Sequence, residues 1–203
     1  MNNLLPDNAK LVPKQAEKVF DGVIHDVYQW PQLMYDGSTA TFEMLKRPNT
    51  VLVLAVLDDQ KVLILRQSQP DRPEHWALPA GRIEVGEEPL AAAKRETLEE
   101  TGYKFSNWKL IDIRQDHAKL EWFSYFYVAT GLVKRGSQNL DNGEKITVHE
   151  VEYSKLVELI KSEEINWTGP INKLLLNGKD QLSDILDLRK IASSADSDLT
   201  TSE

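Results

Sequence analysis

Cysteine is absent from the 203-residue sequence, and long apolar runs are absent as well. The lack of cysteine excludes disulfide bonds, zinc–thiolate sites and thiol catalysis, and it suits a reducing compartment. The longest apolar run, residues 51–57, is far shorter than the roughly 20 residues that a membrane-spanning helix requires. The first ten residues, MNNLLPDNAK, are too polar for a signal peptide. We therefore expect a cytoplasmic protein that has no membrane partner.

Basic residues are in the minority, with 24 Lys and Arg against 32 Asp and Glu, which gives a formal net charge of -8. Non-specific binding of nucleic acid depends on clustered Lys and Arg, so we expect no nucleic-acid partner. A phosphate-bearing substrate would need metal ions to offset the repulsion. Hydrophobic residues make up 41% of the chain, which is enough for one sizeable core.

Strand patterns dominate the first third of the chain. Residues 18–57 contain short β-branched and aromatic segments separated by Asp21-Gly22, Asp36-Gly37 and Pro48. Residues 51–56 and 61–65 predict a hairpin, and residues 70–74 predict an exposed loop.

The last half of the chain mixes strand and helix signals. The pattern predicts strands at 108–113, 122–130 and 145–152, with a polar loop at 131–143. We expect a helix capped by Ser154 that runs to about residue 162, and another at 169–177. The Ser-, Thr- and Asp-rich residues 192–203 predict a disordered tail.

The clearest helix signal lies between Pro89 and Thr101. Two glutamates precede Pro89, which suits the first helical turn, three alanines follow, and Gly102 suits the position just past the end.

Three carboxylates of this helix, Glu96, Glu99 and Glu100, stand at i, i+3 and i+4 and so share one face. Like charges at this spacing repel, whereas a divalent cation favours the cluster. Carboxylate oxygens select Mg²⁺ or Mn²⁺ over zinc. The alternative interpretation is a solvated acidic face.

The surrounding residues favour the metal interpretation. Gly81 is followed after five residues by Glu87, and after seven more by Arg95-Glu96, and the segment ends in Glu99-Glu100-Thr101-Gly102-Tyr103. This pattern resembles the Nudix box. It departs from the box at Thr97, where an aliphatic residue is usual, on the side expected to face the core.

The resemblance implies an α/β fold, the Nudix α/β/α sandwich around a mixed sheet, and Mg²⁺-dependent hydrolysis of a nucleoside diphosphate linked to another group. It implies that Glu96, Glu99 and Glu100 and the Ala80 carbonyl bind metal. It also implies structural roles for residues that shape the motif, which are Gly81, Glu87, Arg95 and Gly102, with Arg95 pairing to Glu87.

A catalytic base is expected in the late loop Leu140–Ile146, because relatives of the ADP-ribose pyrophosphatase type resemble this chain and supply an acid from such a loop. Glu144 is the first candidate and Asp141 the second, with Glu99 also assigned a catalytic role. The alternative for Glu144 is an ordinary acid before a strand. Glu84 and Arg82, in Gly81–Glu84, are expected to contact substrate.

The N-terminal segment resembles the strands of nucleoside-diphosphate-sugar hydrolases that form a homodimer. We expect residues 1–47 to be a dimerisation segment, 48–191 the hydrolase domain and 192–203 a tail. Tyr28 and Trp30 share a strand face, and Trp30 is a candidate substrate contact. The aromatics Trp122, Phe123, Tyr125 and Tyr127 are expected in the core rather than stacked on a base.

The predicted function is hydrolysis of a nucleotide-sugar, with ADP-ribose giving AMP and ribose 5-phosphate as the leading reaction. Two alternatives stay open: a Nudix hydrolase of another nucleotide, and a noncatalytic Nudix domain that binds a nucleotide as a sensor. The retained carboxylates Glu96, Glu99 and Glu100 favour catalysis.

Overall fold

Three sheets and four helices form the part of the chain that the computed structural model describes, residues 5–6, 8–165 and 167–188. In chain order the elements are β1 (Glu17–Phe20), β2 (Asp26–Leu33), β3 (Thr39–Lys46), β4 (Thr50–Ala55), β5 (Val62–Gln69), β6 (Arg72–Ala77), β7 (Ala80–Arg82), α1 (Pro89–Thr101), β8 (Tyr103–Arg114), β9 (Leu120–Glu121), β10 (Ser124–Arg135), β11 (Lys145–Val151), α2 (Tyr153–Lys161), α3 (Ile171–Leu176) and α4 (Leu182–Leu186).

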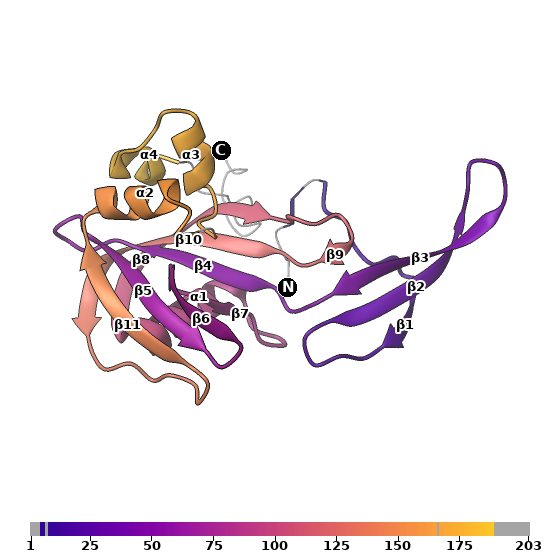
Figure 1. Cartoon of the computed structure of the whole chain (residues 1–203), viewed down its shortest axis with the longest axis horizontal. Helices are drawn as coiled ribbons and strands as arrows, with labels where there is room; N and C mark the ends of the chain where they lie inside the picture. Colours follow the sequence, from indigo (N-terminus) through magenta and orange to yellow (C-terminus); the bar gives the residue numbers. More distant parts are fainter. Residues whose placement is uncertain (1–4, 7, 166, 189–203) are drawn as a thin grey trace, which may run out of the picture.

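The body is a three-layer α/β/α sandwich, as the resemblance implied (Figure 1). One sheet has the order β7-β4-β10-β8, with β4 and β10 parallel, and the other has the order β11-β5-β6. Residues of β4 alternate between two cores: Leu52 and Leu54 pack toward α2, α3 and α4, while Val51 and Val53 pack toward α1. Alternation along a strand thus builds both faces of the sandwich from one buried segment.

The predicted hairpin between residues 51–56 and 61–65 is wrong. The turn forms, with the Leu57 amide donating to the Lys61 carbonyl at 2.8 Å, but the two strands pair at only one bridge, Val56 with Val62. Beyond it, β4 joins the β7-β4-β10-β8 sheet and β5 joins the β11-β5-β6 sheet. Both strands are buried on both faces in their first residues, so each needs a covering layer on either side, which separate sheets provide.

Two smaller predictions also need correction. Residues 72–74 lie in β6 rather than in a loop, because Arg72 pairs with Gln69 across a tight turn. Ser154 lies inside α2, whose N-cap is Glu152. Of the four aromatics expected in the core, Phe123, Tyr125 and Tyr127 are buried there, whereas Trp122 is only partly buried. The predicted tail, residues 192–203, lies outside the described residues.

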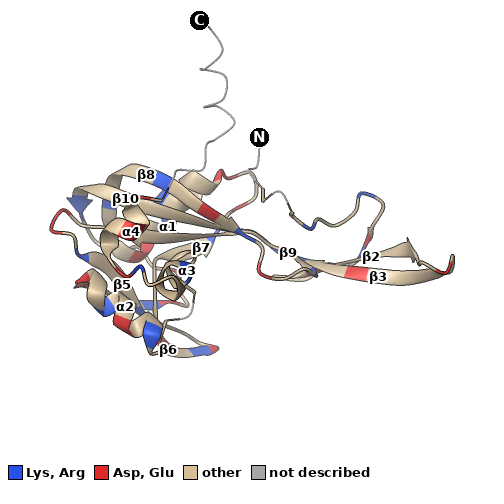
Figure 2. Cartoon of the chain, turned by 90° about the horizontal axis from the view of Figure 1, so that it is seen from above, with Lys and Arg blue, Asp and Glu red and all other residues tan. Residues whose placement is uncertain are grey.

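An arm made of β1, β2 and β3 projects from the body (Figures 1 and 2). The arm joins the body where β3 pairs with β9 at Leu45–Leu120 and Lys46–Glu121. Its surface carries exposed apolar side chains, Val19, Phe20, Val23, Leu33 and Tyr35 among them. The homodimer predicted through this segment stays a prediction. None of the helices in the described residues combines the length and the apolar character of a membrane span.

Candidate active site

Helix α1 carries the three predicted carboxylates and has the predicted bounds. Pro89 occupies its first turn, and Gly102 ends it in the left-handed region at φ 76°, where its amide donates to the Leu98 carbonyl at 2.8 Å. A Cβ on Gly102 would collide with the backbone of Gly136 and Ser137. Gly102 therefore both stops the helix and lets the loop after β10 lie against its end.

Glu100 and Glu96 lie between α1 and strand β7. Glu100 is only 5% exposed, and one of its carboxylate oxygens accepts a hydrogen bond from the Ala80 amide at 2.9 Å. Burial raises the pKa of Glu100 well above its ordinary value, and the charges of Glu96 and Glu144 raise it further. Burial also raises the pKa of Glu96. Such desolvated carboxylates gain from a cationic partner.

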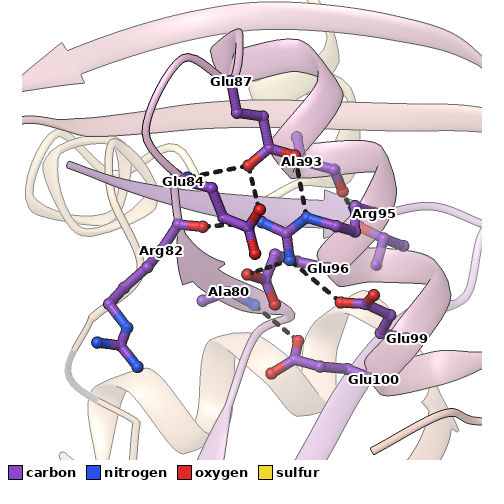
Figure 3. Close-up of polar contacts among 10 residues, drawn as sticks. Ala80, Arg82, Glu84, Glu87, Ala93, Arg95, Glu96, Glu99 and Glu100 are labelled. Atoms are coloured by element: carbon purple, nitrogen blue, oxygen red, sulfur yellow. Dashed lines mark hydrogen bonds and ion pairs between the residues drawn. The ribbon is translucent and has the colours of Figure 1, made fainter. Parts of the chain in front are cut away.

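Arg95 sits at the centre of the motif (Figure 3). Its Nε and Nη2 donate to the two oxygens of Glu87 at 2.9 and 2.8 Å, and Nη2 also donates to the Arg82 carbonyl at 2.9 Å. Its Nη1 donates to Glu96 at 2.8 Å and to Glu99 at 3.1 Å. One guanidinium thus joins the loop before α1 to the helix and also contacts two of the predicted metal ligands.

Among the described residues, no three acidic or histidine side chains converge closely enough to enclose a metal ion. Arg95 Nη1 lies between Glu96 and Glu99, while Glu100 turns toward the Ala80 amide. The donor set nevertheless fits a hard divalent cation, because it offers three carboxylates on one helical turn beside a strand backbone. Cation binding would require Glu96 and Glu99 to exchange Arg95 Nη1 for the metal.

Gly81 makes room for this arrangement. A Cβ at this position would overlap the carboxylate carbon and both oxygens of Glu96. Since β7 runs directly beside α1, only a residue without a side chain lets the Glu96 carboxylate lie against the strand.

The loop that carries the candidate bases is tied to the C-terminal end of α1. The amides of Gly136 and Asn139 donate to the carbonyls of Gly102 and Glu99 at 2.8 and 2.9 Å. The Gln138 side chain donates to the Glu100 carbonyl at 2.6 Å and to the Ile146 carbonyl at 3.2 Å. Residues 139–145 therefore start and finish close to the helix that bears the carboxylates.

Glu144 is half-buried on this loop. Burial raises its pKa, and the charges of Asp141 and Glu99 raise it further. All three carboxylates line one cleft. The Glu144 amide donates to the Asp141 carbonyl at 3.0 Å, so the two candidate bases belong to one turn.

A cleft of about 690 Å³ collects most of the predicted site residues. Its lining includes Ala80, Gly81, Arg82, Glu84, Arg95, Glu96, Glu99, Glu100, Asp141 and Glu144. Glu87 and Gly102 do not line the cleft: Glu87 accepts hydrogen bonds from Arg95, and Gly102 ends α1. Trp30 does not line the cleft either: the ring lies in β2, 8% exposed and packed edge-on against Phe42, and its contact with substrate stays a prediction. A second hollow of about 860 Å³, beside α2 and residues 180–183, is lined by none of the predicted site residues.

Sequence reasoning missed the wall of the cleft that carries Arg47 and Trp167. Arg47 stacks on Trp122, with its guanidinium 4.8 Å from the ring centroid. The ring centroids of Trp122 and Trp167 are 5.9 Å apart. The three residues are separated by 75 and 45 positions in the chain, and no local pattern predicts such contacts.

Comparison with known proteins gives consistent results. The NUDIX domain family model matches residues 46–172. The chain is 31% identical over 152 residues to the ADP-ribose pyrophosphatase of Bacillus subtilis (strain 168), covering 73% of this chain and 82% of that protein. It is 28% identical to the methanol dehydrogenase activator of Bacillus methanolicus, covering 74% and 83%. A crystal structure of an ADP compounds hydrolase superposes with a TM-score of 0.62 at 17% identity, covering 78% of this chain and 86% of that chain, and it shows the same fold.

Proposed function

The chain belongs to the Nudix family of hydrolases, and on that premise we propose that it is a Mg²⁺-dependent pyrophosphohydrolase of nucleoside diphosphate sugars, with ADP-ribose as its substrate. Water and ADP-ribose would give AMP and ribose 5-phosphate. The observation that carries the proposal is the cleft in which the carboxylate turn of α1 faces the acidic loop at Asp141 and Glu144. The similarity to an ADP-ribose pyrophosphatase over most of both chains supports the choice of substrate.

Glu96, Glu99 and Glu100 and the Ala80 carbonyl would hold the Mg²⁺ ions, and Mn²⁺ would fit the same oxygen ligands. When bound, the metal would neutralise the diphosphate, stabilise charge that grows in the transition state and lower the pKa of the attacking water. The raised pKa values of Glu96 and Glu100 support this assignment, because a cation favours the charged form that burial disfavours.

Glu144 would accept the proton of the attacking water, with Asp141 as the substitute on the same turn. Its half-buried position raises its pKa, which brings a carboxylate closer to the range of an effective base at neutral pH. Glu84 and Arg82, both exposed on the cleft, would contact the substrate, and Trp30 would approach it from the partner subunit of a homodimer.

Arg95 and Glu87 would hold the loop between β7 and α1 in place. Their two parallel hydrogen bonds are the geometry in which a guanidinium and a carboxylate interact most strongly, and Glu87 also accepts from the Glu84 amide at 3.0 Å. The pair would therefore fix the position of Glu84 relative to the helix.

A substrate screen with mass detection tests the proposal. Nucleotide-sugars, dinucleoside polyphosphates and nucleoside triphosphates are incubated with the protein and Mg²⁺, and we expect AMP and ribose 5-phosphate from ADP-ribose. Glu144→Gln is expected to lower kcat about 10² to 10⁴-fold while KM changes only a few-fold, because the base acts on water. Asp141→Asn is the matched variant. If Glu144→Gln keeps its kcat and Asp141→Asn loses it, the base is Asp141.

A second candidate function is regulation of another enzyme. The similarity to a methanol dehydrogenase activator over most of both chains motivates it. Retention of Glu96, Glu99 and Glu100 favours turnover instead. Calorimetric binding of a nucleotide in Mg²⁺ without any product in the screen would select the regulatory function.

A further inference from the structure

Two arginines line the cleft near the point where strands β4 and β7 meet. Arg82 is the last residue of β7 and pairs with Thr50, and the Ile83 amide continues the pairing to the Asn49 carbonyl at 2.8 Å. Arg47 lies just before this point on the other segment, and both arginines line the cleft. In Figure 3 the Arg82 side chain points away from the carboxylates of α1.

Neither guanidinium has an acidic partner among the described residues. The ion pairs formed there by arginine use Arg66, Arg95, Arg114 and Arg135. Arg47 stacks on Trp122 instead, and its Nε is buried without a hydrogen-bond partner in the described part of the chain. Trp122 is itself fixed, since its Nε1 donates to the Thr50 hydroxyl at 3.1 Å.

This arrangement presents positive charge without neutralising it. Stacking on an aromatic ring orients a guanidinium and leaves its N–H groups free in the plane of the stack. Burial lowers the pKa of Arg47, and repulsion from the charge of Arg82 lowers it further. An anion between the two guanidiniums would remove that repulsion and supply acceptors to donors that have none.

We propose that Arg47 and Arg82 form a metal-independent binding site for a phosphate group of the substrate, on the wall of the cleft that Trp122 and Trp167 support. The proposal rests on the proposed function for the identity of the anion. One phosphate of the diphosphate would lie at the carboxylates of α1 with the metal, and the Arg47–Arg82 site would hold the other. The enzyme then selects linear diphosphate compounds by two separate recognition sites of opposite charge.

Binding of inorganic pyrophosphate in EDTA tests the site without catalysis. Isothermal titration calorimetry compares the wild type with Arg47→Gln, Arg82→Gln and the double variant. We expect each single substitution to weaken binding about tenfold and the double to weaken it further, since each removes a charged donor. Arg72→Gln is the matched control: Arg72 is exposed on the same cleft, has no stacking partner in the described residues, and changes the net charge equally.

The outcomes distinguish binding of pyrophosphate at the Arg47–Arg82 site from general attraction of pyrophosphate by positive charge on the cleft. Equal weakening by Arg72→Gln, or no pyrophosphate binding by the wild type in EDTA, would overturn the proposal. Arg47→Gln removes a stacked side chain and could unfold the protein, whereas Arg82 is exposed, so Arg82→Gln keeps the test decisive.

Kinetics separate this proposal from the proposed function. With ADP-ribose and Mg²⁺, Arg47→Gln and Arg82→Gln are expected to raise KM about tenfold and to leave kcat within a few-fold, because the contact exists in both ground and transition states. Turnover by the wild type with pyrophosphate affinity and KM unchanged in both variants would refute the anion site alone. Pyrophosphate binding that depends on both arginines, without turnover of any nucleotide-sugar, would refute the proposed function alone.

Discussion

Substitution of Gly81 by alanine tests how the carboxylate turn is placed. The new Cβ would occupy the position of the Glu96 carboxylate, so something must move. The colliding atoms are the end of a flexible side chain, which can rotate away, and the backbone of β7 can stay paired with β4. We therefore expect the fold to survive while Glu96 leaves its place beside the strand.

The cost in stability follows from the contact that Glu96 loses. Its hydrogen bond with Arg95 is charge-assisted and its side chain is 16% exposed, so its loss costs about 1–2 kcal/mol of unfolding free energy. For a chain of this length that lowers Tm by about 2–8 °C. Metal binding loses an anionic ligand, so the Mg²⁺ concentration for half-maximal activity is expected to rise about tenfold to a hundredfold.

A double-mutant cycle tests whether Gly81 acts through the Glu96 carboxylate. Calorimetry and Mg²⁺ titrations compare Gly81→Ala, Glu96→Ala and the double variant. Because Glu96→Ala removes the atoms that the Cβ would meet, the double variant is expected to match Glu96→Ala closely. Additive losses would show that Gly81 acts on something other than Glu96 and would refute the steric explanation.

Further predictions concern the carboxylates, Arg95 and the arm. Glu100→Gln is expected to remove most Mg²⁺-dependent turnover while circular dichroism stays native, because an amide replaces an anionic ligand; full turnover would refute the metal assignment. Arg95→Ala is expected to lower both Tm and kcat, since it breaks contacts to Glu87, Glu96 and Glu99; an unchanged Tm would contradict its structural role. Because burial raises the pKa of Glu96 and Glu100 above 4.5, the folded state favours their protonated forms. In EDTA the unfolding free energy should therefore fall as pH rises from about 4.5 through the raised values, and saturating Mg²⁺ should offset that loss; urea titrations that are flat with pH would contradict it. Light scattering is expected to give the mass of two 23.1-kDa chains, and deletion of residues 17–46 is expected to give monomers without activity; a monomeric full-length chain would refute the dimer.

Local chemistry made α1 predictable to the residue. Pro89, the alanines and Gly102 act within one or two turns of chain, and the spacing of the glutamates places them on one face without any tertiary information. The cleft residues from Ala80 to Glu100 follow from the same motif, which is why the structure gathers them together.

Features that depend on distant segments escaped prediction. Residues 51–65 look like a hairpin locally, and only the presence of β10 beside β4 and β11 beside β5 shows that the strands belong to different sheets. The stack of Arg47 on Trp122 joins segments that are far apart in the chain. The contact of Arg95 with Glu96 and Glu99 was likewise unexpected, because the motif indicated only its pairing with Glu87.

The attachment of residues 136–139 to the last turn of α1 has a consequence for how this enzyme can diversify. The hydrogen bonds from Gly136, Gln138 and Asn139 are accepted by main-chain carbonyls, which every amino acid possesses. The attachment therefore does not depend on which side chains the helix carries. Residues 140–144 beyond it form a turn closed by the hydrogen bond from the Glu144 amide to the Asp141 carbonyl, and we expect that they can be exchanged or lengthened without disturbing the helix. Grafting experiments that swap only this short segment between relatives are therefore expected to transfer the proposed proton acceptor, while the helix and its proposed metal ligands remain those of the recipient.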